Sequence, residues 1–315
     1  TRTTATPTGI FAIMQKVIKR NEIYEDLPPL VREKFYQVRV DSEREARATN
    51  QIKGKTAEVT LAQIYKIMRL MHGLTDKQED LLKQLELETE YENIVPIQHN
   101  IEKLKEYKKR YLVFLISDMY LSESIIRKML LKIDKIFEDI PIMVSCDYEK
   151  TKASGQLYDV FLAQNGIKPE EWIHVGDNKI SDGIQVEIKG GKAQLVDLYP
   201  YTDFETVTIS NNIDNADFQL ALGAVKNSNP KESEFYEIGR RFGGVILYSY
   251  ILWVLETAKK LDIGDLYFIA RDGYVLKAIA DVIVQEKGWG IRTHYLYGSR
   301  KAWQLPSLGD SKDDL

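Results

Sequence analysis

Two aspartates that closely follow an apolar segment are the residues best suited to chemistry. The segment WIHVG (172–176) is typical of a strand, and Asp177 and Asp182 follow it within one loop. Such carboxylates suit Mg²⁺, which usually takes one or two protein carboxylates and leaves positions for phosphate oxygens. Gly176 at the turn would let the backbone fold sharply and bring the carboxylates close to a ligand. The alternative is a structural loop in which Asp182 caps the next helix.

A hydroxyl and an ammonium group follow two other apolar segments. Ser117 ends YLVFLIS (111–117), where its hydroxyl could bind a phosphate oxygen. Lys152 follows PIMVS (141–145) and could neutralise the charge of a phosphate or a nucleophile. As alternatives, Ser117 would be a helix N-cap and Lys152 a solvated charge at the start of a helix. Three consecutive strands that end in a serine, a lysine and the aspartate pair favour one phosphate-binding site.

Strands that alternate with helices are expected to position these groups. Apolar segments predict strands, with helical patterns between them, at 111–117, 141–145, 172–176 and 192–198. Strands that are apolar throughout indicate a parallel sheet covered on both faces. Such sheets bind ligands at the carboxyl ends of their strands, where the polar groups lie. The predicted fold class is therefore α/β.

The first hundred residues are predicted to be helical. Thr8 is a candidate N-cap for a helix with apolar residues at helical spacing, and Thr60 with Gln63 predicts a capping box. Arg39 and Glu43 lie one helical turn apart. We interpret them as part of a solvated or ion-paired helix face, with substrate contacts as the alternative.

The C-terminal part predicts a second α/β domain. A polar stretch centred on KNSNPKES (226–233) is typical of a linker. A long apolar helix follows, then the strand LYFIA (266–270) and a last strand, THYLYGS. We therefore assign residues 206–235 to a linker and residues 236–315 to an incomplete α/β domain.

The composition excludes several classes of protein. The chain of 315 residues has 43 basic and 47 acidic side chains, and its net charge of −4 argues against a general nucleic-acid-binding surface. The single cysteine, Cys146, excludes an internal disulfide framework and favours a cytoplasmic setting. The longest apolar stretch, from about Val245 to Leu255, is shorter than the roughly 20 residues of a membrane helix. No membrane span is expected, and nothing indicates a protein partner.

The order of these segments resembles the haloacid dehalogenase (HAD) superfamily. The strand that ends in Ser117, then Lys152 with its K-x-x-G-x-L-Y sequence, then G-D-x-x-x-x-D at 176–182 match the second, third and fourth motifs of that superfamily. The resemblance implies a HAD-like Rossmannoid parallel sheet at 106–205. It also implies an inserted helical cap at 1–105, which would close over the site and select the substrate.

The resemblance also implies a role for each candidate residue. Ser117 would bind the phosphate and Lys152 would neutralise its charge. Asp177 would bind Mg²⁺, the implied cofactor, and Asp182 would orient the metal shell. Asp118 and Asn178, which adjoin Ser117 and Asp177, are further candidates for contacts with a small phosphorylated substrate.

One motif of the superfamily, D-x-D, has no match after an apolar strand before Ser117. In that family its first aspartate attacks phosphorus and its second is the general acid and base. We therefore interpret the chain as an inactive fragment whose nucleophile lies upstream of Thr1. Segments such as TRTTATPTGIF and LYFIARDGYVLK are similar to predicted bacterial hydrolases encoded near surface-polysaccharide genes. The implied activity is phosphohydrolysis of a small metabolite, such as a sugar phosphate.

Two other functions stay open. In one, the chain is a non-catalytic HAD-like protein that binds a ligand or scaffolds surface-polysaccharide biosynthesis. In the other, the C-terminal domain is the functional unit, for example a transferase that uses Arg271 and Asp272. FIARDGY also resembles a first HAD motif, but Ala270 stands at the nucleophile position, so no aspartyl-phosphate can form there.

Overall fold

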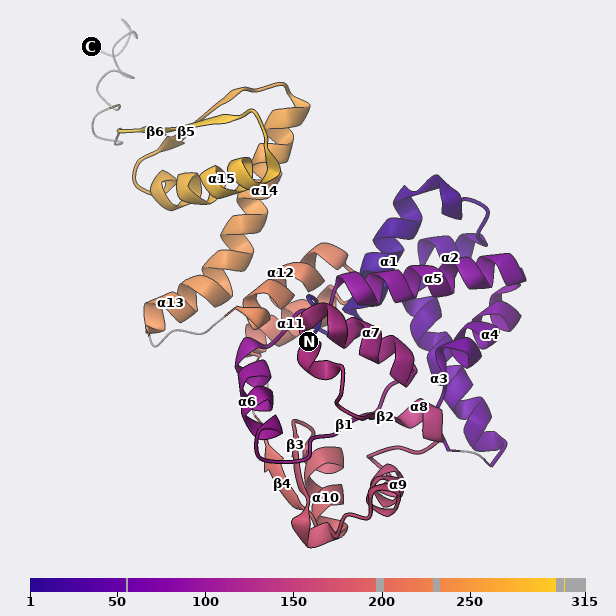
Figure 1. Cartoon of the computed structure of the whole chain (residues 1–315). Coiled ribbons are helices and arrows are strands. Elements are labelled where there is room, and N and C mark those ends of the chain that lie inside the picture. Colours follow the sequence, from indigo (N-terminus) through magenta and orange to yellow (C-terminus); the bar gives the residue numbers. More distant parts are fainter. Residues whose placement is uncertain (55, 197–200, 229–232, 299–302, 304–315) are drawn as a thin grey trace, which may run out of the picture. The chain divides into compact units, whose positions relative to one another are not determined.

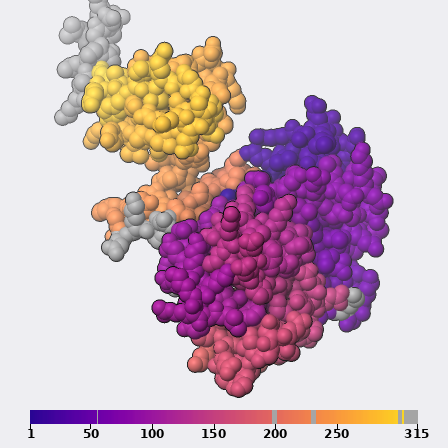
Figure 2. All heavy atoms as spheres, viewed as in Figure 1, coloured from indigo at the N-terminus to yellow at the C-terminus, as the bar shows by residue number. Residues whose placement is uncertain are grey.

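The chain divides into two compact units, Thr1–Asn227 and Ser228–Leu315. The computed structural model describes residues 1–54, 56–196, 201–228, 233–298 and 303. Each unit has a hydrophobic core of its own. In the first unit, the N-terminal helices (indigo to purple) pack against the α/β part (magenta to pink), as Figure 2 shows.

Helices form the N-terminal half of the first unit, as predicted. They are α1 (Gly9–Arg20), α2 (Pro29–Glu33), α3 (Phe35–Ile52), α4 (Leu61–His72), α5 (Asp76–Glu92) and α6 (Gln98–Lys108), with a short 3₁₀ turn at Glu22–Tyr24. The capping box of Thr60 and Gln63 is confirmed. Thr8 stands at the N-cap position of α1, as predicted, but its side chain forms no capping hydrogen bond, and its hydroxyl lies 3.0 Å from the Tyr36 hydroxyl instead.

The α/β part follows these helices, and the predicted fold class is confirmed. Its elements are β1 (Leu115–Ser117), α7 (Glu123–Ile133), β2 (Ile142–Val144), α8 (Ser145–Tyr148), α9 (Gln156–Asn165), β3 (Ile173–Gly176), a π-helical turn (Lys179–Ile184), α10 (Gln185–Ile188) and β4 (Lys192–Leu195). Short 3₁₀ turns lie at Lys135–Phe137 and Pro169–Glu171. The strands pair in parallel, β1 with β2 and β3 with β4. Two residues of the last predicted strand, at 197 and 198, lie outside the described residues.

The two strand pairs do not form the single sheet that was expected. Among the described residues, β1 is hydrogen-bonded only to β2 and β3 only to β4. Both pairs contribute to one core with Tyr158 and Phe161 of α9, through Ile116 of β1 and Ala193 of β4. Strands β1 and β3 are the inner members of the two pairs (Figure 1). Each therefore keeps one edge without a described strand partner.

Two helices occupy most of the stretch for which we predicted a linker. Helices α11 (Asp203–Asn211) and α12 (Ala216–Asn227) belong to the first unit. Helix α12 holds the N-terminal segment, because the Ala5 amide donates to the Gln219 carbonyl at 2.8 Å and the Asn227 side chain donates to the Arg2 carbonyl at 2.9 Å. The boundary between the units therefore falls after Asn227, and residues 229–232 of the predicted linker lie outside the described residues.

The second unit is a smaller α/β arrangement. It contains α13 (Glu234–Ile238), a π-helical turn (Gly239–Gly243), α14 (Gly244–Lys260), β5 (Asp265–Ile269), α15 (Gly273–Lys287) and β6 (Arg292–Leu296), which pairs in parallel with β5. Helices α13 and α14 are continuous through the π turn. By length and composition alone, the resulting helix of 27 residues is apolar enough to cross a membrane. One such helix is weak evidence for a membrane span. Residues 299–302 and 304–315 of the predicted domain lie outside the described residues.

Candidate active site

The six candidate residues from the sequence line one pocket of the first unit. The pocket has a volume of about 400 Å³ and lies at the carboxyl ends of β1 and β3; its lining includes Ser117, Asp118, Lys152, Asp177, Asn178 and Asp182. The carboxyl ends of β1 and β3 thus bring these side chains together, as predicted. A more open hollow of about 560 Å³ on α1 is lined by Lys16, Val17, Arg20, Asn21 and Glu22, and it contains none of the candidate residues.

Asp182 is the buried anchor of the pocket. One carboxylate oxygen lies 2.6 Å from Lys152 Nζ and 3.1 Å from His174 Nε2. The other accepts hydrogen bonds from the backbone amides of Asp177 and Asn178 at 3.2 and 3.0 Å. Burial alone would raise the pKa of Asp182, but the hydrogen bonds from His174 and Lys152 outweigh it and hold that pKa well below its ordinary value. Asp182 therefore orders the loop and the lysine around it.

Asp118 holds the loop that carries Lys152. Both of its carboxylate oxygens accept from the Lys152 backbone amide, at 2.8 and 3.1 Å. Lys152 is thus fixed at its backbone by one aspartate and at its ammonium group by Asp182. An ammonium group has three donors, so Lys152 retains donors for a phosphate oxygen.

Asp177 and Ser117 are the groups left available for a ligand. Asp177 is exposed and Ser117 half-buried, and no described residue forms a hydrogen bond with either side chain. No group of three or more His, Cys, Asp or Glu among the described residues could hold a metal ion by itself. One free carboxylate still fits Mg²⁺, which takes its other ligands from water and substrate phosphate. Asp177 is the residue of this chain that would hold it.

Asn178 and Gly176, which adjoin Asp177, have specific structural roles. Asn178 accepts the amides of Ile180 and Ser181 at 2.9 and 3.0 Å, so Asn178 caps the following turn rather than Asp182. A Cβ atom on Gly176 would lie 2.5 Å from the carboxyl carbon of Asp182. Gly176 is therefore required for the close approach of Asp182 to the strand, rather than for a sharp turn.

Tyr158 and His174 support Asp182 and were not predicted as site residues. The Tyr158 hydroxyl donates to the Ser181 carbonyl at 2.9 Å and lies 3.3 Å from His174 Nε2. The sequence indicated a site role for them only weakly, through an aromatic residue shortly after Gly155 and a histidine inside β3. Cys146 is not assigned a role in the site. Burial raises the pKa of its thiol to about 12, so the reactive thiolate form is disfavoured.

Comparison with known families agrees with this arrangement. Residues 30–190 match the family model described as haloacid dehalogenase-like hydrolase. The chain belongs to this family. No curated protein matches the chain. The match covers the second to fourth HAD motifs and most of the helical part, so the predicted superfamily is confirmed and membership supports hydrolase activity in general.

The match does not extend to the second unit of this HAD-like hydrolase. Arg271 and Asp272 follow β5 there and are exposed. No described residue forms a hydrogen bond or ion pair with either side chain. These contacts do not test the transferase hypothesis for this unit.

Proposed function

We propose that this HAD-like protein is a Mg²⁺-dependent phosphohydrolase of small phosphorylated metabolites, with sugar phosphates as the first class to test. The observation that carries the proposal is the pocket in which a free carboxylate, Asp177, lies with a free hydroxyl, Ser117, and a fixed ammonium group, Lys152. These are groups that a phosphate ester and its counter-ion require.

The chain's own residues would bind and orient the phosphoryl group. The Ser117 hydroxyl would donate to one phosphate oxygen and the Lys152 ammonium group to another. Asp182 would hold the ammonium group of Lys152 in place, since it lies 2.6 Å from the ammonium nitrogen. Mg²⁺ bound by Asp177 would offset the negative charge that develops on the phosphoryl oxygens.

The nucleophile would come from a further strand between β1 and β3. Each of these strands has a described partner on one edge only. The side chains of β3 are also open, with Ile173 and Val175 exposed to 58% and 43%, whereas strands of a covered parallel sheet are buried. An aspartate at the carboxyl end of such a strand would lie beside Ser117 and Asp177. We propose that this strand precedes Thr1 and that its aspartate attacks phosphorus. The bond between phosphorus and the ester oxygen would break and the alcohol would leave, giving an aspartyl-phosphate that water hydrolyses to inorganic phosphate and the free aspartate.

The test compares the present chain with a version extended by the residues encoded before Thr1. Both are assayed with para-nitrophenyl phosphate and a panel of sugar phosphates, with Mg²⁺ and with EDTA. We expect turnover only in the extended protein and only with Mg²⁺. In the extended protein, Asp177→Asn should lower kcat/KM at least about 100-fold, because Asp177 is the proposed metal ligand.

Glu187→Gln is the matched control, because Glu187 is an acidic residue of the neighbouring α10 and does not line the pocket. Its activity should remain that of the parent protein. Absence of Mg²⁺-dependent turnover on every ester, or full activity in Asp177→Asn, would overturn the proposal. Binding of phosphate esters without turnover would favour the non-catalytic alternative.

A further inference from the structure

The turn that follows β1 leads directly out of the candidate phosphate site. It begins at Ser117 and Asp118, which line the pocket, and it ends where α7 begins at Glu123. Ser122 stands at the N-cap position of α7, but its side chain makes no capping hydrogen bond. The shape of the turn therefore depends on contacts from other segments of the chain.

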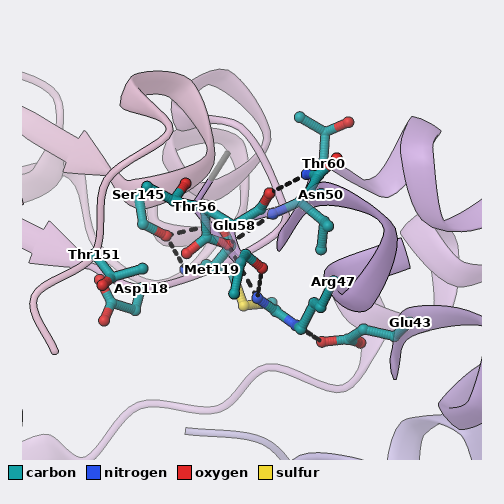
Figure 3. A network of polar contacts seen from close by, with 12 residues as sticks. Glu43, Arg47, Asn50, Thr56, Glu58, Thr60, Asp118, Met119, Ser145 and Thr151 are labelled. Carbon is teal, nitrogen blue, oxygen red and sulfur yellow. Dashed lines mark hydrogen bonds and ion pairs between the residues drawn. The ribbon is translucent and has the colours of Figure 1, made fainter. Parts of the chain in front are cut away.

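Ser145, the first residue of α8, holds the middle of this turn. It is 0% exposed. Its hydroxyl oxygen accepts the Met119 amide at 2.9 Å, and the hydroxyl donates to the Met119 carbonyl at 3.4 Å. One buried side chain thus contacts both backbone polar groups of Met119, next to Asp118 (Figure 3). Without this hydroxyl, the Met119 amide would lose its acceptor, which is costly away from water.

Asp147, also in α8, holds the end of the turn. Its Oδ2 atom accepts the Glu123 amide at 2.8 Å. Glu123 is the first residue of α7, so Asp147 caps that helix in place of Ser122. A carboxylate at this position is favoured further by the positive end of the helix dipole. Two residues of α8 therefore fix the backbone of the turn at two points.

Asp118 contacts the second segment in return. Lys152 lies in the loop that leaves α8, and its backbone amide donates to both carboxylate oxygens of Asp118, at 2.8 and 3.1 Å. The side chains of Ser145, Asp147 and Asp118 thus form a brace between the turn after β1 and the segment after β2. Neither segment can shift alone without breaking hydrogen bonds of the brace.

We propose that Ser145 and Asp147 are positioning residues of the phosphate site. By fixing the turn they determine where Ser117 lies, and through Asp118 they determine where the Lys152 loop lies. Neither Ser145 nor Asp147 lines the pocket, so both act through the backbone of the turn and not on a ligand. The catalytic consequence rests on the proposed phosphohydrolase function, whereas the brace itself stands on the contacts alone.

The first experiment therefore needs no activity. Backbone amide exchange is measured by NMR in the present chain for Ser145→Ala and Ser145→Cys. Ser145→Ala should speed exchange about tenfold at Met119, which loses its acceptor, and also at Lys152, which Asp118 holds. Ser145→Cys keeps a weak acceptor of similar size and should give intermediate rates. Faster exchange at Met119 with unchanged exchange at Lys152 would overturn the proposal.

Ser42→Ala is the matched control. Ser42 is also 0% exposed, and its hydroxyl donates to the Val38 carbonyl within α3 at 2.7 Å, away from the pocket. The variant should leave the exchange of the Lys152 amide at the parent rate. An equal rise at Lys152 in Ser42→Ala and Ser145→Ala would assign the effect to a general loss of stability and would also overturn the proposal.

Asp147→Ala tests the second contact of α8, and it replaces Ser145→Ala if that variant does not fold, because Asp147 is exposed. It should speed exchange at Glu123 and, by a smaller factor of about threefold, at Lys152. Asp147→Asn keeps an acceptor oxygen and should restore the parent rates. Parent-like exchange at Lys152 in Asp147→Ala would overturn the positioning role of Asp147.

The second experiment measures kcat and KM in the extended, active protein. Ser145→Ala should lower kcat about tenfold with less than a twofold change in KM, because Ser145 orients the phosphate-binding groups and does not itself bind the substrate. Ser42→Ala should keep both constants. Parent-like kcat in Ser145→Ala would contradict the positioning role. Absence of any turnover in the parent protein would instead contradict the proposed function and leave the exchange result valid.

Discussion

The ammonium nitrogen of Lys152 lies 2.6 Å from Oδ1 of Asp182, and both side chains are largely buried, at 14% and 3% exposure. Such a pair contributes to stability only where further hydrogen bonds satisfy both groups. Asp182 meets this condition through His174 and two backbone amides. The pair therefore joins the loop after β2 to the loop after β3, and its geometry sets where a phosphate could bind.

Lys152→Met should destabilise the first unit by about 3 kcal/mol, because it leaves the buried carboxylate of Asp182 without its cation. Urea unfolding at neutral pH measures the change. Lys189→Met is the control, since Lys189 pairs with Asp159 at 26% and 55% exposure and such surface pairs contribute at most about 1 kcal/mol. Equal losses of unfolding free energy in the two variants would contradict the larger contribution assigned to the buried pair.

Asp182 should also give a defined pH dependence. Its pKa in the folded protein lies below the ordinary value of 3.8, so its contribution to stability is complete above that value and is lost as the pH falls through the lowered pKa. Asp182→Asn should thus be less stable than the parent by a constant amount from pH 7 to about 5, and the difference should shrink below pH 3.8. Unfolding free energies over this range provide the measurement. A difference that already shrinks between pH 7 and about 5 would point to another group.

The sequence was sufficient for the parts of the site that depend on strand order. Ser117 ends β1, Lys152 lies beyond β2 and Asp177 follows β3, and these three residues line one pocket although β1 and β3 are not paired with each other. The partners of Asp182 and Asp118 could not be predicted. Asp118 lies 34 positions before Lys152 and holds its backbone amide, a contact that depends on how two loops turn after their strands. No pattern of residue types indicates such turns.

The burial of charged residues could not be predicted from the sequence either. The spacing of Arg39 and Glu43 predicted a solvated or ion-paired helix face; the ion pair exists at 3.0 Å, but Arg39 is not solvated. The same guanidinium is 0% exposed and lies 2.7 Å from Glu86 of α5, a contact between helices. Periodicity shows which residues share a face of one helix but does not show which helix will cover it.

Gly176→Ala should disturb the site because the new Cβ would lie 2.5 Å from the Asp182 carboxyl group. The expected loss is about 1–3 kcal/mol of stability, as for other overpacked positions, with a fall in kcat of the extended protein. Gly183→Ala is the control within the same loop, since its Cβ would meet Leu195 at an ordinary contact distance of 3.6 Å. Similar stability and kcat in both variants would show that Asp182 can move without consequence.

Arg39→Met tests the buried ion pair that joins α3 to α5. The guanidinium contacts both oxygens of Glu86, at 2.7 and 2.8 Å, and lies 4.4 Å from the centre of the Phe11 ring. The substitution leaves the Glu86 charge buried without a cation, which should cost about 3–5 kcal/mol in urea unfolding.

The double variant Arg39→Met with Glu86→Leu should recover most of that loss, because apolar residues of similar size can replace a buried pair. The Tyr65 hydroxyl, which donates to Glu86 at 2.7 Å, would keep the Leu82 carbonyl at 3.2 Å as its acceptor. Arg44→Met, at a side chain that is 75% exposed, should change stability by less than about 0.5 kcal/mol. If the double variant is as unstable as Arg39→Met, the cost comes from lost packing of the arginine on its aromatic neighbours rather than from the unpaired charge.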